Sequence, residues 1–435
     1  MLKRFIIENF LSFDNETVLD LTSGRGEIHL NHLNRFKNIK ILKTAIIYGA
    51  NASGKSNLIK AIDYGRNLIV SKTPADTYNK FFRLKQDNRN KASKFEFEIE
   101  INKIFFVYGF EVILNSREIK EEWLYKLTEK SERMIFSRSQ NKIELGNLLK
   151  NSKFKANFEV YKDDMINRKN KLFLSELGEK KIQTEDKSFS YINKIYEWFV
   201  KKLIVIYTES KNVITFADDL DLYLKYIKSF DTDIIDIKEI EENFDEFSEK
   251  LPLSLKENIQ EDILKGVNKI TFYDSKEITP YSIYQDENQK LKVKKLILIH
   301  NEKSKTEFEF KEESDGTKRL FDLIPLIGKF NDDYTILIDE FDRSLHPKLT
   351  KKFFEIFYSF KNSKTQIITT THEVTLLDLK LVRRDEVYFM EKGSKGESKL
   401  FSLAEFNERY DKKIDKAYLL GRYGGIPVIK DILVN

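Results

Sequence analysis

A glycine-rich stretch near the N-terminus has the composition and spacing of a phosphate-binding loop. Residues 49–56 read Gly-Ala-Asn-Ala-Ser-Gly-Lys-Ser, and the pattern predicts a strand before them over 44–48 and a helix after them over 55–69. Such a loop turns its backbone N–H groups towards a phosphate, and the N-terminus of the following helix adds positive potential. A chance glycine-rich turn is the alternative, and the flanking strand and helix argue against it. The residues expected to bind the nucleotide are Gly49, Asn51, Ala52, Ser53, Gly54, Lys55, Ser56 and Asn57.

Two carboxylates end a second apolar segment. Residues 335–340 read Thr-Ile-Leu-Ile-Asp-Glu, which predicts a buried strand with Asp339 and Glu340 at its carboxyl end, where open α/β sheets place ligands. An Asp-Glu pair alone is more often a solvated turn, but the phosphate-binding loop reverses that preference. We expect Asp339 and the Ser56 hydroxyl to hold Mg²⁺, and Glu340 to act as the general base on the attacking water. The sequence therefore predicts hydrolysis of Mg-ATP.

A histidine follows the next predicted strand. His372 lies in the run Thr-Thr-Thr-His-Glu at 369–373, after a strand expected over 365–368. A histidine at a strand end is usually a satisfied polar residue. Its place after the acidic strand favours a catalytic role instead, as a hydrogen-bond donor to the γ-phosphate.

At these residues the chain resembles the ABC-type ATPase heads of the SMC, RecF and OLD-like group. In that group a P-loop, a signature turn, an Asp-Glu strand, a D-loop and a switch histidine follow in this order. His372 occupies the place of the switch histidine. The signature place is occupied by Ser314, Asp315, Gly316 and Thr317, and the D-loop place by Ser344, Leu345, His346 and Pro347.

The resemblance implies how the site is completed. In the group, the signature turn of one head closes over the P-loop of another, so a homodimer would be the smallest active unit and a higher homo-oligomer is also compatible. Asp315 and Thr317 depart from the Leu-Ser-Gly-Gly-Gln form of the signature. Gln86 lies at a suitable interval for the group's glutamine loop, although a surface polar residue is the simpler interpretation.

Together with the Ser-Asp-Gly-Thr turn at 314–317, three further segments look like those of bacterial phage-defence ATPases, among them the ATPase component of PARIS and the related RloA and AbiLi proteins. They are the opening at 7–13, the run at 340–347 and the tail at 418–427. This resemblance implies an antiviral ATPase that senses a phage trigger protein and holds or gates a separate effector, a TOPRIM-type or RloB-like nuclease, in abortive infection. The tail suits a partner contact or an ordinary glycine-rich turn equally well. The alternative function is a DNA-binding repair ATPase of the RecF or SMC kind.

Composition excludes several other classes. The 435 residues include 75 basic and 70 acidic side chains, a net charge of +5 that is too small to indicate a nucleic-acid partner by itself. Basic residues gather at 130–171 and 290–295, where solvated faces are the simpler interpretation. The absence of cysteine removes thiol chemistry and cysteine-ligated zinc. No long apolar run occurs, so we expect a cytoplasmic protein with no membrane contact.

Periodicity indicates the elements that must position these residues. Alternation of apolar and polar residues predicts hairpins over 2–21 and 94–113, with the Glu96, Glu98 and Glu100 face wet, and a further strand pair over 118–145. From 150 to 290 the spacing is helical. We therefore expect an α/β fold, an ABC-type P-loop ATPase head with a mixed sheet and an antiparallel β-subdomain, interrupted by a mainly helical insertion. Its segments are 1–145, 146–290 and 291–435.

Overall fold

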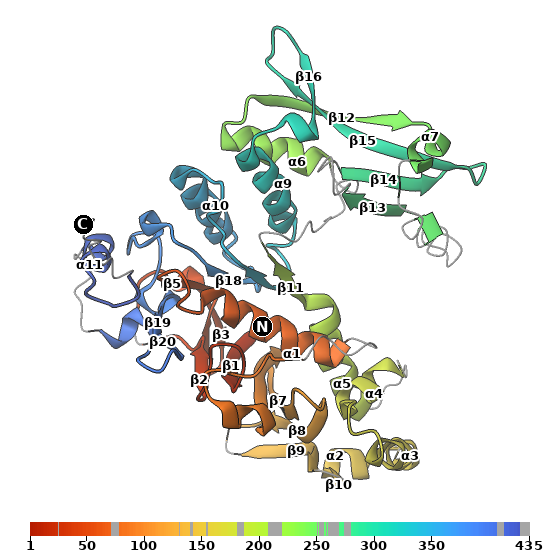
Figure 1. The fold of residues 1–435 in the computed structure, drawn as a ribbon, viewed down its shortest axis with the longest axis vertical. Coiled ribbons are helices and arrows are strands. Elements are labelled where there is room, and N and C mark those ends of the chain that lie inside the picture. The colour runs from red at the N-terminus through yellow and green to blue at the C-terminus, as the bar shows by residue number, and fades with distance from the viewer. Residues whose placement is uncertain are drawn as a thin grey trace, which may run out of the picture. The chain divides into compact units, whose positions relative to one another are not determined.

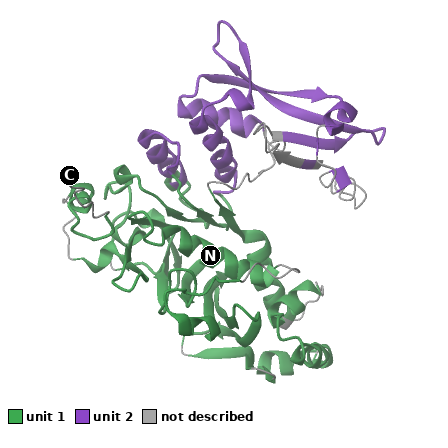
Figure 2. Ribbon diagram, viewed as in Figure 1, with its two compact units in different colours: residues 1–207, 331–341, 358–435 green, residues 208–330, 342–357 purple. Residues whose placement is uncertain are grey.

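The chain folds into two compact units (Figures 1 and 2). Unit 1 is assembled from residues 1–207, 331–341 and 358–435, and unit 2 from residues 208–330 and 342–357. The computed structural model describes residues 1–24, 26–70, 78–129, 131–139, 142–153, 155–180, 187–207, 220–249, 251, 256–257, 259, 269–273, 280–406 and 413–426.

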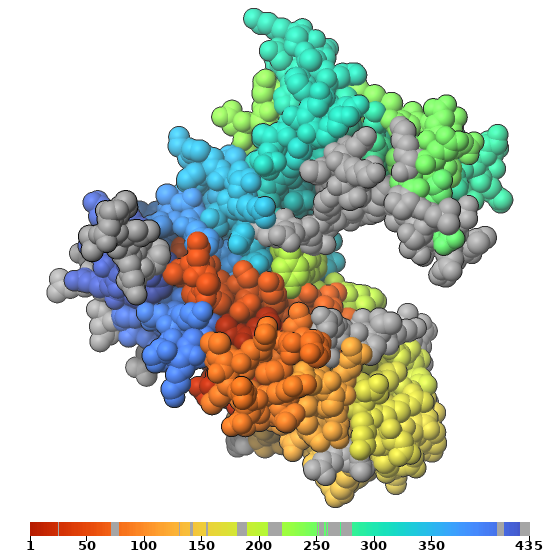
Figure 3. All heavy atoms as spheres, viewed as in Figure 1, coloured from red at the N-terminus to blue at the C-terminus, as the bar shows by residue number. Residues whose placement is uncertain are grey.

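The first sheet of unit 1 is antiparallel and contains both predicted hairpins. Its strands, in the order β10-β9-β8-β7-β6-β1-β2, are β1 (Leu2–Glu8), β2 (Thr17–Asp20), β6 (Ser93–Ile101), β7 (Ile104–Ile113), β8 (Glu118–Leu127), β9 (Glu132–Ser139) and β10 (Lys142–Leu145). The predicted turn at Asn102 and Lys103 has positive φ at both residues (53° and 63°), the conformation of a tight two-residue hairpin loop. Orange atoms, from the part of the chain that contains β6 and β7, form a continuous area on the face shown in Figure 3.

One expectation about this sheet is wrong. Glu98 and Glu100 are only 5% and 4% exposed, so this side of β6 is not a wet face. Glu98 forms an ion pair with Lys3 of the neighbouring strand, and Glu100 accepts a hydrogen bond from the Lys103 backbone at 2.5 Å. These partners become visible only once the strands are paired.

The second sheet of unit 1 has a parallel centre. Its order is β11-β17-β18-β5-β19-β20, and all pairs are parallel except the last. The strands are β5 (Thr44–Gly49), β11 (Leu203–Ile206), β17 (Thr335–Ile338), β18 (Gln366–Thr370), β19 (Val387–Lys392) and β20 (Ser398–Ser402). β5, β17 and β18 are buried along their whole length, which fits their sequences of mainly apolar residues and threonine. A short hairpin, β3 (Leu33–Phe36) and β4 (Ile39–Leu42), precedes β5.

A buried glutamine joins the two sheets. Gln366 Nε2 donates to the carbonyls of Leu2 and Leu42 at 2.9 Å each, and its Oε1 accepts from the Leu2 N–H at 3.1 Å. One hydrophobic core runs from the antiparallel sheet, with Phe5, Phe95 and Phe97, to the helices that follow. The helices of unit 1 are α1 (Lys55–Val70), α2 (Asn147–Lys150), α3 (Lys155–Ile166), α4 (Phe173–Glu179), α5 (Lys187–Glu197) and α11 (Ile414–Leu419).

Unit 2 combines helices with a five-stranded sheet. β15 lies between β12 and β14, β13 pairs with β14, and β16 also pairs with β15. The elements are α6 (Leu220–Ile227), β12 (Ile234–Glu242), α7 (Phe244–Glu249), β13 (Lys269–Tyr273), β14 (Pro280–Gln285), β15 (Leu291–His300), β16 (Thr306–Glu309), α9 (Asp315–Gly328) and α10 (Pro347–Ser359), the last two residues of which belong to unit 1.

The α/β fold is confirmed, but the insertion is not mainly helical throughout. Helices α2 to α5 lie among the described residues between 147 and 197, whereas β11 belongs to the parallel sheet of unit 1 and β12 to β15 belong to the sheet of unit 2. Glu239 and Glu242, in the segment expected to be helical, lie on or at the end of β12 and pair across strands with Lys294 at 2.9 Å and Lys295 at 2.7 Å. The basic run at 290–295 is therefore largely a neutralised, solvated sheet face.

Candidate nucleotide site

Three adjacent parallel strands bring the predicted chemical residues to one edge of the central sheet. The P-loop follows β5, the acidic pair follows β17, and His372 lies two residues after β18, which is paired with both of the others. Carboxyl ends of parallel strands meet at one edge, where α/β proteins bind ligands. All three elements belong to unit 1.

The P-loop has the backbone that a phosphate cradle requires. Ala52 and Gly54 have φ of 62° and 111°, so the chain curls before it enters α1 at Lys55. A Cβ atom at position 54 would lie 2.0 Å from Ser398 Oγ, so only glycine fits there. Lys55 Nζ lies 2.7 Å from the Gly49 carbonyl and 3.2 Å from that of Ala50. The ammonium group is thus already held at the loop that it is predicted to serve.

A group of hydroxyls braces the P-loop from outside. Ser398 Oγ lies 2.6 Å from the Ser53 carbonyl and 2.7 Å from Ser12 Oγ, and Asn57 Nδ2 donates to Ser12 Oγ at 2.8 Å. Ser12 belongs to the sequence opening at 7–13, whereas nothing in the sequence marked Ser398. The opening therefore contributes to the P-loop structure.

The acidic pair is held tightly. Asp339 is 5% exposed, and its N–H donates to the Ile206 carbonyl at 2.9 Å. Glu340 has a φ of 46°, a left-handed conformation that is uncommon outside glycine. Thr370, at the end of β18, contacts both residues: its Oγ1 lies 2.6 Å from Asp339 Oδ1 and accepts the Glu340 N–H at 2.8 Å. The sequence run at 369–373 had suggested a role only for His372.

Tyr207 is a second residue that sequence reasoning missed. It follows β11, the neighbour of β17, and its hydroxyl donates to Asp63 Oδ2 on α1 at 3.0 Å. Burial, together with the charges of Asp63 and Asp339, raises the pKa of Tyr207. The tyrosine therefore stays a neutral hydrogen-bond donor that ties the P-loop helix to the strand beside the acidic pair. Its only sequence signal is its place after a short apolar run.

His372 is exposed at the strand edge. Its backbone is fixed on both sides, because the Thr371 N–H donates to the Ile47 carbonyl at 3.1 Å and the Glu373 N–H donates to Thr371 Oγ1 at 2.9 Å. The Tyr48 hydroxyl in turn donates to the Glu373 carbonyl at 3.2 Å. The residue is thus presented from a rigid turn tied to the strand that leads into the P-loop.

The predicted signature and D-loop lie together in unit 2. Ser314 caps α9, its Oγ accepting the Thr317 N–H at 3.1 Å, and Asp315 and Gly316 form the first turn of that helix. A Cβ atom at Gly316 would lie 2.8 Å from the Ser344 carbonyl, so the two loops touch. After Leu345, His346 Nδ1 accepts the Lys348 N–H at 3.2 Å, and Pro347 begins α10.

The donor set fits magnesium bound with a nucleotide. Mg²⁺ usually keeps several waters and takes one or two protein ligands beside substrate phosphates, which matches one buried carboxylate and one hydroxyl, Asp339 and Ser56. Lys55, held at the Gly49 carbonyl, supplies positive charge at the curled loop.

Comparison with known proteins identifies a family that includes these residues. A family model described as "AAA domain, putative AbiEii toxin, Type IV TA system" matches residues 45–378. The chain belongs to this AAA family. The match begins inside β5 and ends beyond His372, so it includes the P-loop, the acidic pair and the histidine. No curated protein matches the chain.

Solved structures similar to this AAA-family chain include SMC heads. The SMC head domain from Thermotoga maritima is 12% identical with a TM-score of 0.40, covering 92% of this chain and 98% of that one. A Smc head from Pyrococcus furiosus, with an extended coiled coil and bound to the C-terminal domain of ScpA, is 14% identical with a TM-score of 0.43, covering 97% and 98%. A SmcHead bound to the C-winged helix domain of ScpA is 14% identical with a TM-score of 0.45, covering 92% and 97%.

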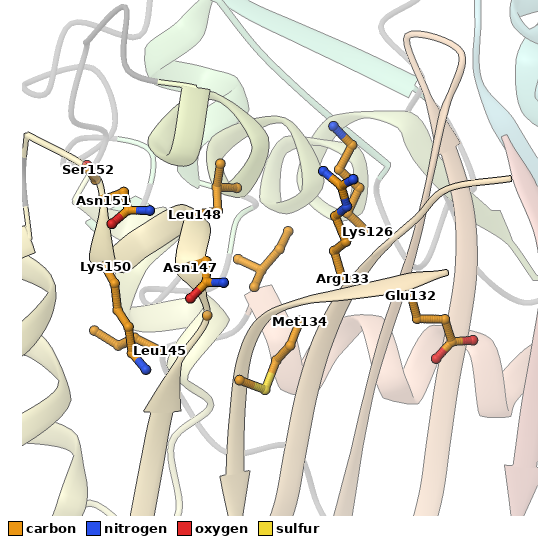
Figure 4. A pocket seen from close by; sticks show the side chains of 12 residues that line it. Lys126, Glu132, Arg133, Met134, Leu145, Asn147, Leu148, Lys150, Asn151 and Ser152 are labelled. Atoms are coloured by element: carbon orange, nitrogen blue, oxygen red, sulfur yellow. The ribbon is translucent and has the colours of Figure 1, made fainter. Parts of the chain in front are cut away.

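A cavity of about 800 Å³ lies elsewhere in unit 1 of the AAA-family chain, between β8, β9 and α2 (Figure 4). Lys126 and Arg133 line one side of it and Lys150 and Asn151 the other, and Glu132 is the single carboxylate among its lining residues. Some other described cations of the 130–171 run have partners within unit 1; Arg138, for example, donates to the carbonyls of Lys171 at 2.7 Å and Arg168 at 3.0 Å.

Two remaining expectations can be placed. Gln86 is exposed on a short 3-10 helix (Gln86–Asn90), as expected of a surface residue. In the tail, Tyr423 is 1% exposed and stacks on Phe389 at 5.4 Å, so it is a core residue; Pro427 lies outside the described residues.

No helix among the described residues has the length and apolar character that crossing a bilayer requires.

Proposed function

We propose that the chain is a Mg-ATP hydrolase. The observation that carries the proposal is the delivery of the P-loop, the acidic pair and His372 by three adjacent parallel strands to one sheet edge. Lys55 and the loop N–H groups bind the phosphates, and Asp339 and Ser56 hold Mg²⁺. Bound Mg²⁺ neutralises charge that develops on the phosphate oxygens.

Asp339 and Glu340 have different roles in the proposed reaction. Asp339 is committed to the metal, which leaves Glu340 to accept a proton from the attacking water as its oxygen bonds to the γ-phosphorus. The bond from that phosphorus to the bridging oxygen breaks, and ADP and phosphate leave. His372 donates a hydrogen bond to the transferred group.

Glu340→Gln tests this assignment. The variant is expected to bind ATP with near-normal affinity and to hydrolyse it at least ~100-fold more slowly, because only the base is removed. Glu373→Gln is the matched control: it is the same change near the next strand end, where the carboxylate already accepts the Thr375 N–H at 2.9 Å. Near-normal turnover by Glu340→Gln would remove the assignment.

We further propose that two chains share each ATP site and that the ATPase gates a separate effector in anti-phage abortive infection. The tail supports a protein contact in one respect: Tyr418 and Tyr423 are buried anchors, while Leu419 and Leu420 between them are 62% and 85% exposed. A rigid turn that presents two leucines suits a protein groove. The proposed partner is a TOPRIM-type or RloB-like nuclease released after a phage trigger.

Substitution of both leucines by serine tests the effector contact. With an effector gene from the same operon co-expressed, the wild-type chain should retain that product on purification and the double variant should lose it, with ATP binding intact. Leu84→Ser, at a side chain 69% exposed, is the control. Equal retention by all three proteins would exclude the tail as the contact.

A DNA-binding repair ATPase is the second candidate, and the basic cavity of Figure 4 is the observation that favours it. Arg133 and Lys150 would contact phosphates, so replacing both with Ala should weaken duplex binding and lower its salt dependence. This second function would be supported if the protein bound duplex DNA in a salt-sensitive way, if that DNA stimulated ATP turnover, and if no protein partner were retained. Binding that is unaffected by the double replacement would count against it.

A further inference from the structure

Thr370 makes three hydrogen bonds to three successive residues of the acidic turn. Its Oγ1 accepts the Glu340 N–H at 2.8 Å and donates to Asp339 Oδ1 at 2.6 Å, and its carbonyl accepts the Phe341 N–H at 3.0 Å. The side chain is completely buried. β17 and β18 are in parallel register with Ile338 beside Thr369, so Thr370 lies one step further, where β17 has ended and the acidic turn begins.

The direction of these hydrogen bonds follows from their donors. The Glu340 N–H can only donate, so the threonine oxygen accepts it. An ionised aspartate can only accept, so the single hydroxyl proton of Thr370 goes to Asp339. The two bonds use complementary capacities of one hydroxyl, and a serine could make both, whereas an isosteric valine could make neither.

The bonds also compensate for an unfavourable backbone. Glu340 has a φ of 46°, and a glutamate adopts that conformation only where its surroundings hold it. Its N–H donates to the Thr370 hydroxyl at 2.8 Å, which holds the backbone at this residue. The same hydroxyl oxygen restricts how the Asp339 carboxylate rotates.

We propose that Thr370 is a positioning residue of the ATPase site: one hydroxyl sets the orientation of the metal-holding carboxylate and the backbone of the general base. The inference rests on the proposed function, since it assigns the way in which Asp339 and Glu340 are kept in register. Thr370 itself acts only through these two residues.

The test compares Thr370→Val with Thr370→Ser and with Thr369→Val. Thr369 is the matched control, because it is the preceding residue, is equally buried, and donates its hydroxyl to the Ile338 carbonyl at 2.9 Å. Thr370→Val should lower kcat by ~100-fold with KM for ATP within about threefold of wild type, because misplacement of reacting groups affects the chemical step. Thr370→Ser and Thr369→Val should stay within about threefold of wild type in kcat.

A binding measurement separates positioning from loss of structure. Thermal unfolding is followed with ATP in EDTA and with ATP and Mg²⁺. Thr370→Val should keep the rise in Tm caused by ATP alone and show a smaller additional rise with Mg²⁺, whereas Thr369→Val should keep both in full. If Thr370→Val does not fold, Thr370→Ala, which removes the same hydroxyl without adding volume, takes its place.

Three outcomes would overturn the inference. One is a Thr370→Val protein with the kcat and Mg²⁺ response of Thr369→Val. Another is a Thr370→Ser protein as defective as Thr370→Val, since the hydroxyl would then not be the cause. A wild-type protein that hydrolyses no ATP would overturn the proposed function and this inference with it, a result distinguishable from the other two.

Discussion

Individual residues of the nucleotide site are constrained by their backbone conformation as much as by their side-chain chemistry. Gly54 and Glu340 both have positive φ, one on the phosphate side and one on the water side of the proposed reaction. Glycine has this freedom without cost, whereas the glutamate depends on its neighbours. Each position therefore predicts a different response to substitution.

Gly54→Ala should abolish ATP binding. The added Cβ would meet Ser398 Oγ at 2.0 Å and Ser12 Oγ at 2.8 Å in a conformation that alanine avoids, so the loop must move. The measurement is the rise in Tm on adding Mg-ATP, which should disappear. Gly24→Ala, where the nearest atom is 3.6 Å from the new Cβ, should behave as wild type. An unchanged rise in Tm in Gly54→Ala would show that the contacts of Ser398 and Ser12 do not constrain the loop at this position.

Lys43 predicts a pH-dependent stability. Burial lowers its pKa to about 8, partly opposed by Glu386. Below pH 8 the folded protein holds a buried charge that the unfolded chain solvates, and between about pH 8 and the usual value of 10.5 the folded state loses this proton first. The contribution of Lys43 to stability therefore rises with pH across that window.

Lys43→Met should accordingly raise Tm at pH 7, and the gain over wild type should shrink as the pH passes 8. Thermal unfolding at several pH values from 6.5 to 10 measures it. Lys380→Met, at an exposed lysine, should show no such trend. A gain that stays constant to pH 10 would mean that burial of this charge is not the cause.

At the scale of elements, the tail acts as a packed extension of the central sheet. Tyr418 stacks on Phe389 of β19 at 5.3 Å and donates its hydroxyl to the Gly425 carbonyl at 3.1 Å. A Cβ at Gly425 would lie 3.4 Å from the Cα of Gly49. The tail thus lies against the first P-loop glycine. Packing of the tail is therefore expected to affect the nucleotide site.

Tyr423→Ala should therefore destabilise unit 1 by about 3 kcal/mol, because a buried ring is lost from its stack on Phe389. It should also weaken ATP binding, as the anchor beside Gly49 loosens. Tyr423→Phe keeps the ring and should be much milder. Denaturant unfolding and ATP titration of the two variants measure these effects; equal stability would place the ring outside the core.

How much of this could be predicted depends on whether the signal was local. The P-loop, β17 with its two carboxylates and the β6-β7 hairpin are encoded within short windows, and all were predicted close to their observed bounds. β11 is a four-residue apolar run among helices, and only its pairing with β17 identifies it as a central strand. The hydroxyl of Thr370 gained a role only through the register of β17 and β18.

At the scale of the whole molecule, the proposed shared site predicts complementation between chains. Lys55→Ala damages the P-loop, and Ser314→Ala removes the signature hydroxyl while costing only a helix cap. Ser314 is a better target than Gly316, where any side chain would strike the Ser344 carbonyl. In a mixed dimer, one site would contain both defects and the other none.

Mixing the two impaired proteins should thus restore about a quarter of wild-type ATPase activity, because half of randomly formed dimers are mixed and each has one intact site. A chain carrying both substitutions, mixed with either single variant, is the control and should restore nothing. Failure to recover activity despite demonstrated subunit exchange would show that each chain completes its own site.

The strand order of the central sheet also determines when each strand can find its partners during translation. β5, which leads into the P-loop, pairs only with β18 and β19, and β18 begins at Gln366. For most of translation the apolar segment Thr44–Gly49 has both hydrogen-bonding edges open and no neighbour to cover them. This segment is therefore where a ribosome-associated chaperone would be most needed, and where prematurely terminated chains would aggregate.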